Sequence, residues 1–242
     1  MTISTIEESQ RKAARVVGFA YLFAMVIAVF AESYVGGQLI VFDNAAETAR
    51  NIMAHELLFR LGIASSLIIV VSDVALIAAL YVILKRVNKN LAVFAAFLRL
   101  MQTAVYAVTT LNYLDVLRLL SGAGYLQAVG TDHLQALARL SIGSYGAGLN
   151  VAFVFLGLGS TVFGYLWFKS NYIAKALAVL GVCGSLLLAA GSFAIIIFPS
   201  LAKILSLAYM MPLGVFEITM GFWLLFKGLR PSGVAEPDKA SG

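Results

Sequence analysis

Residues 57–84 read LLFRLGIASSLIIVVSDVALIAALYVIL, and this stretch decides the fold class. As an α-helix it is ~42 Å long at ~1.5 Å per residue, whereas the hydrocarbon core of a bilayer is ~30 Å thick. Arg60 and Asp73 are the charged residues within it. A helix that is apolar on nearly every face, over this length, indicates a membrane span.

Further stretches of the same kind occur along the chain, and none alternates apolar and polar residues as β-barrel strands do. The sequence therefore predicts an all-α polytopic membrane protein, a bundle of six transmembrane helices at 16–34, 57–84, 91–114, 145–168, 174–198 and 205–226. Residues 1–230 form the single predicted domain. Residues 231–242 are rich in Pro, Gly, Ser and charge, which predicts a disordered cytoplasmic tail.

The composition excludes several classes of protein. Of the 242 residues, 61% are hydrophobic and 12% charged, and the mean hydropathy is +0.93. A soluble domain is about 45–50% apolar and about 25% charged. A soluble enzyme, a disordered protein and a disulfide-rich secreted domain are therefore excluded. Cys183 is the single cysteine, and its apolar neighbours predict an inert buried thiol.

Basic residues predict the orientation of the bundle in the membrane. One side receives Arg11, Lys12, Arg15, Lys85, Arg86, Lys89, Lys169, Lys175, Lys227, Arg230 and Lys239. The other side receives Arg50, Arg60, Arg118, Arg139 and Lys203. By the positive-inside rule the richer side is cytoplasmic, so we expect a protein of the cytoplasmic (inner) membrane with both termini in the cytoplasm. This rule also accounts for the net charge of +5, so we expect no nucleic-acid partner.

The first span allows an alternative interpretation. It follows basic residues and ends at VFA (29–31), which a signal peptidase accepts. Cleavage there would leave five spans and disturb the alternating pattern of charge.

Two longer connections on the less basic side are expected to hold short interfacial helices. In 35–56, Asn44 and Glu47 fit a capping box that starts a helix. In 119–144, Thr131 is a candidate N-cap for a short surface helix over 133–139. Pro212 is expected either to start or to kink the sixth span.

Ionisable residues within the spans are the candidate functional groups. Measured from the basic residue at the end of each span, Asp73 lies ~18 Å deep, and Arg99 and Glu217 lie ~15 Å deep. Each such group costs about 2.5–3.5 kcal/mol on insertion scales. We therefore expect all three to face the bundle interior, where Arg99 pairs with Asp73, Glu217 or both. Either they form a ligand site or they form a staple that fixes the helices.

Polar residues continue along the third span at helical spacing, and small residues along the fourth. The first set predicts either a cavity that opens outward or a row of interhelical hydrogen bonds, and comprises Arg99, Gln102, Thr103, Tyr106, Thr110 and Tyr113. The second predicts close helix packing, and comprises Gly143, Gly146, Asn150, Gly157, Thr161 and Gly164. Gly181 and Gly184 on the fifth span are interpreted in the same way.

A second polar layer is predicted near the outer surface, where a charged side chain costs little free energy and is usually solvated. It comprises Glu32, His55, Glu56, Arg60, Asp115 and Arg118. Glu32 and Arg60 lie at similar depth, so a pair between them is expected. A lipid-headgroup site or outer gate is the alternative to a simply solvated layer.

Three hypotheses for function follow. The first is a transporter or binding protein for a small anionic solute or lipid, with Arg99, Asp73, Glu217, Gln102 and Tyr106 as ligand-binding residues. The second is a structural or interaction subunit, with a partner protein or a second copy of the chain. The third is an intramembrane enzyme with a carboxylate pair, although no catalytic residue is assigned. No cofactor or metal is expected, because nucleotide-binding, hydrolase and zinc-protease motifs are missing.

The order of these residues resembles the bacterial integral membrane family called domain of unknown function 4386. The matching segments are RVVGFAYL (15–22), Asn51–Ile52 through LFR (58–60), SDV (72–74), LRL (98–100), Gln102, and Glu217 through WLL (223–225) and Gly228. The resemblance covers most of the chain except the tail. It implies the six-span fold and implies no mechanism, because the family carries no assigned activity.

Overall fold

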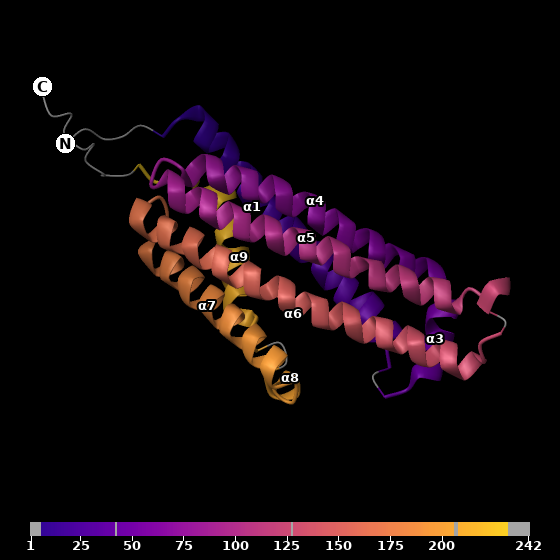
Figure 1. Cartoon of the computed structure of the whole chain (residues 1–242). Coiled ribbons are helices and arrows are strands. Elements are labelled where there is room, and N and C mark those ends of the chain that lie inside the picture. Colours follow the sequence, from indigo (N-terminus) through magenta and orange to yellow (C-terminus); the bar gives the residue numbers. More distant parts are fainter. Residues whose placement is uncertain (1–5, 42, 127, 206–207, 232–242) are drawn as a thin grey trace, which may run out of the picture.

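The computed structural model describes residues 6–41, 43–126, 128–205 and 208–231, and the regular structure within these ranges is entirely helical. The predicted all-α class is confirmed (Figure 1). In chain order the elements are α1 (Glu8–Phe30), the π-helix η1 (Ala31–Gly36), α2 (Gly37–Leu39), α3 (Ala45–Ala54), α4 (Glu56–Leu84), α5 (Lys89–Leu120), the 3₁₀ helix η2 (Gly124–Leu126), α6 (Thr131–Ser170), α7 (Lys175–Ile197), α8 (Leu201–Leu205) and α9 (Met211–Phe226). The predicted tail, 232–242, lies outside the described residues.

Five helical segments are long and apolar enough to cross a membrane, and α9 is a sixth, shorter apolar helix. The five are Glu8–Leu39, Glu56–Leu84, Lys89–Leu120, Thr131–Ser170 and Lys175–Ile197. Helix α9 has 16 residues, or ~24 Å, because it starts at Met211 rather than at the predicted residue 205. Pro212 lies in its first turn and so starts the helix instead of kinking it.

Four parts of the chain meet at one end of the bundle, which we call the basic end. Glu7, just before α1, pairs with Arg86 in the turn between α4 and α5. The Gln10 Nε2 atom donates to the Tyr172 hydroxyl at 3.4 Å, and the Arg230 backbone N–H donates to the Tyr172 carbonyl at 2.9 Å. The start of α1 and the end of α9 therefore lie on the same side. We call the opposite end, where α3 lies, the α3 end (Figure 1).

Helix α3 is a short helix at the place where the first interfacial helix is predicted. Asn44 is its N-cap, and the Asn44 Oδ1 atom accepts a hydrogen bond from the Glu47 backbone N–H at 3.0 Å. The side chain of Glu47 also returns to Asn44, where its Oε2 atom accepts from Nδ2 at 3.1 Å. The cap therefore uses both residues that the sequence pattern singled out.

The second predicted interfacial helix is wrong as a separate element. Helix α6 runs for 40 residues from Thr131 to Ser170 without a break, and Gly130 rather than Thr131 is its N-cap. The segment contains no proline, and glycines such as Gly143 and Gly146 weaken a helix by ~1 kcal/mol without ending it. At ~60 Å, α6 is twice as long as the bilayer core is thick, so it is longer than the hydrocarbon core requires.

The buried side chains form two apolar cores with a polar belt between them. The α3-end core comprises Val35, Leu39, Ile52, Phe59, Ile63, Val116, Leu117, Ala138 and Ile142. The basic-end core draws on α1, α4, α5, α6, α7 and α9. On α5 the two cores stop at Ala95 and Val116, and the buried side chains between them include Arg99, Gln102 and Thr103. This polar belt holds the candidate site.

Glycines bring α6, α7 and α9 close together in the half of the bundle nearer the basic end. A Cβ atom on Gly157 of α6 would lie 2.6 Å from the Ser185 carbonyl oxygen of α7. A Cβ atom on Gly184 of α7 would lie 2.8 Å from the Leu213 backbone nitrogen of α9. The predicted small faces therefore pack as expected here. Gly143, nearer the α3 end, faces open space.

Candidate functional site

Three helices contribute the central group of the polar belt. Arg99 of α5 is 2% exposed, and its Nη2 atom lies 3.4 Å from the Asp73 Oδ1 atom of α4. The Arg99 Nη1 atom donates to the Ser160 hydroxyl of α6 at 2.8 Å. The Gln102 Nε2 atom, one turn along α5, donates to the second carboxylate oxygen of Asp73 at 3.1 Å. The structure thus brings Asp73, Arg99 and Gln102 together, as the sequence predicts.

Helix α6 makes room for the arginine. A Cβ atom on Gly159 would lie 2.9 Å from the Arg99 Cγ atom and 3.2 Å from the Ala95 carbonyl oxygen. Any side chain at position 159 would therefore push against the arginine stem. Gly159 and Ser160 act together, since one admits Arg99 and the other binds its guanidinium. Sequence reasoning missed both residues, although Ser160 lies beside Gly157 and Thr161 on the small-residue segment.

Two buried polar atoms of the group have no hydrogen-bond partner among the residues that the structure describes. They are the Arg99 Nε atom, a donor, and the Gln102 Oε1 atom, an acceptor. Buried polar groups in native proteins are nearly always hydrogen-bonded, and an unmet one costs about 1–3 kcal/mol. The group can therefore bind one further acceptor oxygen at Arg99 Nε and one further hydrogen-bond donor at Gln102 Oε1.

Glu217 of α9 completes the charged group without direct contact. Glu217 interacts electrostatically with Arg99 and Asp73, and Tyr21 of α1 interacts with all three. Within the described residues, Glu217 has no hydrogen bond or ion pair. The ion pair of Arg99 is therefore with Asp73, and of the expected alternatives this one holds.

The polar stripe of α5 faces the bundle interior, but its threonine hydroxyls bond within the helix, and Tyr106 hydrogen-bonds to Tyr145 of α6. The Thr103 hydroxyl donates to the Arg99 carbonyl, and the Thr110 hydroxyl donates to the Tyr106 carbonyl, each at 2.9 Å. Tyr113 stacks on Tyr145 of α6 with ring centroids 3.8 Å apart. These contacts match hydrogen bonding and packing better than the lining of an open cavity.

The predicted outer polar layer is present, with different partners. Arg60 pairs with Glu56 one turn earlier on α4, with Nη2 and Oε1 2.6 Å apart, and not with Glu32. Arg118 pairs with Asp115 at 3.1 Å, also within one helix. Residues three or four apart on a helix are neighbours, so these pairs need no tertiary contact.

Glu32 and His55 of the same layer are both exposed. Glu32 lies in the π-helix η1, so the end of the predicted span 16–34 is not a regular α-helix. The His55 Nδ1 atom lies 3.2 Å from the Asn51 carbonyl oxygen. Cys183 of α7 is also exposed, which corrects the predicted buried thiol, since apolar neighbours do not reveal which face of a membrane helix meets lipid.

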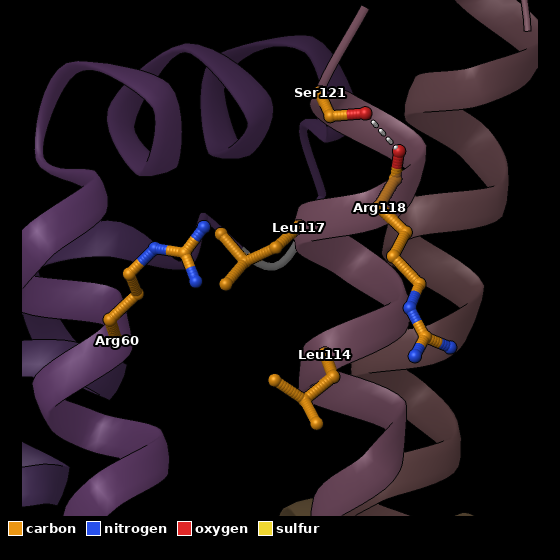
Figure 2. A pocket seen from close by; sticks show the side chains of 5 residues that line it. All are labelled: Arg60, Leu114, Leu117, Arg118 and Ser121. Carbon is orange, nitrogen blue, oxygen red and sulfur yellow. Dashed lines mark hydrogen bonds between the residues drawn. The ribbon is translucent and has the colours of Figure 1, made fainter. Parts of the chain in front are cut away.

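Two cavities lie at the α3 end. One, of about 230 Å³, is lined by Arg60 of α4 and by Leu114, Leu117, Arg118 and Ser121 around the end of α5 (Figure 2). The other, of about 280 Å³, lies among α3, the end of α5 and the start of α6. Neither is lined by the Asp73–Arg99 group.

The comparisons with known proteins place the chain in a family. No curated protein and no solved structure matches it. The family model described as domain of unknown function 4386 matches residues 16–228. That range includes Asp73, Arg99, Gln102, Ser160 and Glu217. Because the match covers most of the chain, this multi-pass membrane protein belongs to the family called domain of unknown function 4386.

Proposed function

We propose that the protein binds a small anionic solute or an acidic lipid group at Arg99 and carries it across the cytoplasmic membrane. The observation that supports this proposal is a pair of buried atoms, Arg99 Nε and Gln102 Oε1, that have no partner within the described part of the chain. A carboxylic or phosphoric acid that keeps one O–H, or an acid with a neighbouring hydroxyl or amine, supplies an acceptor for the first atom and a donor for the second.

The contact between Arg99 and Asp73 suits displacement by such a ligand. At 3.4 Å it is longer than the ~2.7–2.9 Å of strong charge-assisted hydrogen bonds. An incoming anion takes the place of Asp73 on the guanidinium, while Ser160 keeps its hold on Nη1. Asp73 and Glu217 then act as counter-ions or as proton carriers.

A structural staple is the second candidate function. Arg99 links α4, α5 and α6 through Asp73 and Ser160, and Gly159 fits closely against its stem. In this case the protein is a structural or interaction subunit of a membrane complex. Loss of the ion pair then lowers stability and changes no binding.

Native mass spectrometry of protein released from lipid nanodiscs tests these candidates. We expect wild type to retain a small acid or one lipid species, and Arg99→Gln to lose it. Asp73→Asn should retain it at least as well, because the competing carboxylate is gone and the guanidinium remains. Arg50→Gln, which removes an exposed arginine of α3, is the matched control and should behave like wild type.

The same spectra separate the two candidates. Ligand binding at Arg99 is refuted if wild type carries no ligand that Arg99→Gln lacks. The same adducts on wild type and variants, with lowered thermal stability in both Arg99→Gln and Asp73→Asn, would favour the staple.

A further inference from the structure

The cavity between α4 and α5 at the α3 end is not explained by the function proposed above. Arg60 lies thirteen residues before Asp73 on α4, which places the two side chains ~20 Å apart along the helix. The cavity is therefore a site separate from the Asp73–Arg99 group.

The depth of this cavity coincides with a headgroup layer. Arg60 lies ~37 Å along α4 from Lys85, and Leu114 lies ~37 Å along α5 from Lys89. A tilt of ~20°, which is typical of membrane helices, reduces these values to ~35 Å across the membrane. If the lysines mark one edge of the ~30 Å hydrocarbon core, the opposite headgroups occupy the next ~5–7 Å. Arg60 and Leu114 then lie at the level of the lipid phosphates.

The lining combines two arginines and Ser121 with two leucines. Figure 2 shows Arg60 reaching across the gap towards Leu117, with Leu114 beside it and the Arg118 guanidinium on the other side of α5. Toward the centre of the bilayer, the exposed faces of both helices are apolar. The side chains there are Leu61 (47% exposed) and Ile68 (44%) on α4, and Val108 (65%) and Leu111 (54%) on α5. The cavity is thus charged, and the exposed side chains that follow it toward the centre of the bilayer are apolar, which is the order of chemistry along a phospholipid.

The charges around the cavity balance. Glu56 binds the Nε and Nη2 atoms of Arg60 through one oxygen, at 2.7 and 2.6 Å, so Nη1 of Arg60 is left as a donor with no partner among the described residues. Asp115 neutralises Arg118. With two cations and two carboxylates, the site complements a headgroup that itself carries a phosphate and an ammonium group.

We propose that this cavity binds a zwitterionic aminophospholipid from the leaflet at the α3 end. The lipid phosphate accepts from Arg60 Nη1, and the ammonium group lies near Glu56. One acyl chain lies along the exposed apolar side chains of α4 and α5, over Leu61 and Leu111.

Native mass spectrometry with defined lipids tests this site. Protein in nanodiscs of phosphatidylethanolamine and phosphatidylglycerol in equal amounts is released, and the retained lipid is identified by mass. We expect a phosphatidylethanolamine adduct on wild type and up to about fivefold less of it on Arg60→Gln, the largest effect expected of one exposed charge contact. Glu56→Gln should shift the retained lipid to phosphatidylglycerol. Lys203→Gln, an exposed change on α8, should retain the wild-type pattern.

Several outcomes would overturn the proposal. They are an equal adduct on Arg60→Gln, a wild-type preference for phosphatidylglycerol, and binding of inorganic phosphate by detergent-purified protein without lipid. Arg60 is exposed, so the variant should fold, and an unchanged unfolding temperature checks this. Arg99→Gln should keep this adduct, because its site is ~20 Å away. Failure here therefore leaves the function proposed for Arg99 untouched, and the reverse also holds.

Discussion

The two ends of the bundle are built by different means. At the basic end, α1, α4, α5, α6, α7 and α9 share one apolar core, and contacts between distant segments close the end. Toward the α3 end, α4, α5 and α6 continue with η1, α2 and α3 beside them, and the ion pairs stay within single helices (Figure 1). One end therefore has a large core tied together by contacts between distant segments, and the other has a smaller core, local ion pairs and both described cavities.

The same substitution, glycine to alanine, at two positions of α6 tests this difference in packing. We expect it to give the largest change in stability. Gly157→Ala should destabilise the protein by about 1–3 kcal/mol, because its Cβ would lie 2.6 Å and 2.7 Å from backbone atoms of α7. Gly143→Ala should stabilise it by about 0.5–1 kcal/mol, since its Cβ meets open space and alanine favours helix. Thermal unfolding in one detergent measures both. Equal effects of the two changes would contradict the contrast between the ends.

The next largest effect on stability is expected in the polar belt between the two cores. Asp73→Asn, Arg99→Gln and the double variant form a cycle that isolates the interaction across the 3.4 Å ion pair. We expect a coupling energy of about 0.6–2 kcal/mol, the range of interhelical polar contacts in membranes. Unfolding free energies of the four proteins provide the measurement. A coupling near zero would remove the staple as a function of this group and leave ligand binding as its role.

In the Asp73–Arg99 group, the sequence predicted the residues that differ chemically from their surroundings. Asp73 and Arg99 are charged residues in apolar helices, so their depth alone indicated a common level and a shared interior. Gly159 and Ser160 complete the site, but small neutral residues are common in membrane helices, and spacing does not show which of them faces an arginine. Only the packing of α5 on α6 reveals their role.

The errors in the predicted fold also arise where the sequence pattern carries no information on packing or helix ends. Hydropathy predicted where the chain is apolar, and this located the spans. It did not predict where a helix ends, so the continuation of α6 to Thr131 and the late start of α9 at Met211 were missed. Helix ends depend on caps and prolines, as Asn44 and Pro212 illustrate, and membrane-facing surfaces depend on neighbours, as Cys183 illustrates.

The smallest expected effect compares one ion pair from each end. Glu7 and Arg86 join α1 to the turn after α4, and each is about half exposed (48% and 49%). Glu56 and Arg60 are neighbours on one helix. Exposed pairs contribute about 0–1 kcal/mol and helical i,i+4 pairs about 0.3–0.5 kcal/mol, so Glu7→Gln and Glu56→Gln should both lower stability slightly. Urea titrations at 50 mM and 1 M salt measure these differences.

Salt distinguishes the roles of these two pairs. High salt screens exposed charges, so the effect of either substitution should shrink at 1 M. Glu7→Gln should also loosen the start of α1, because its ion pair connects segments far apart in the chain, and hydrogen exchange at the first turn of α1 should rise. Glu56→Gln breaks a contact inside α4 alone, so exchange elsewhere should not change. If Glu7→Gln left the exchange of α1 unchanged, Gln10 and the apolar core would suffice to close the basic end, and the ion pair would be incidental to it.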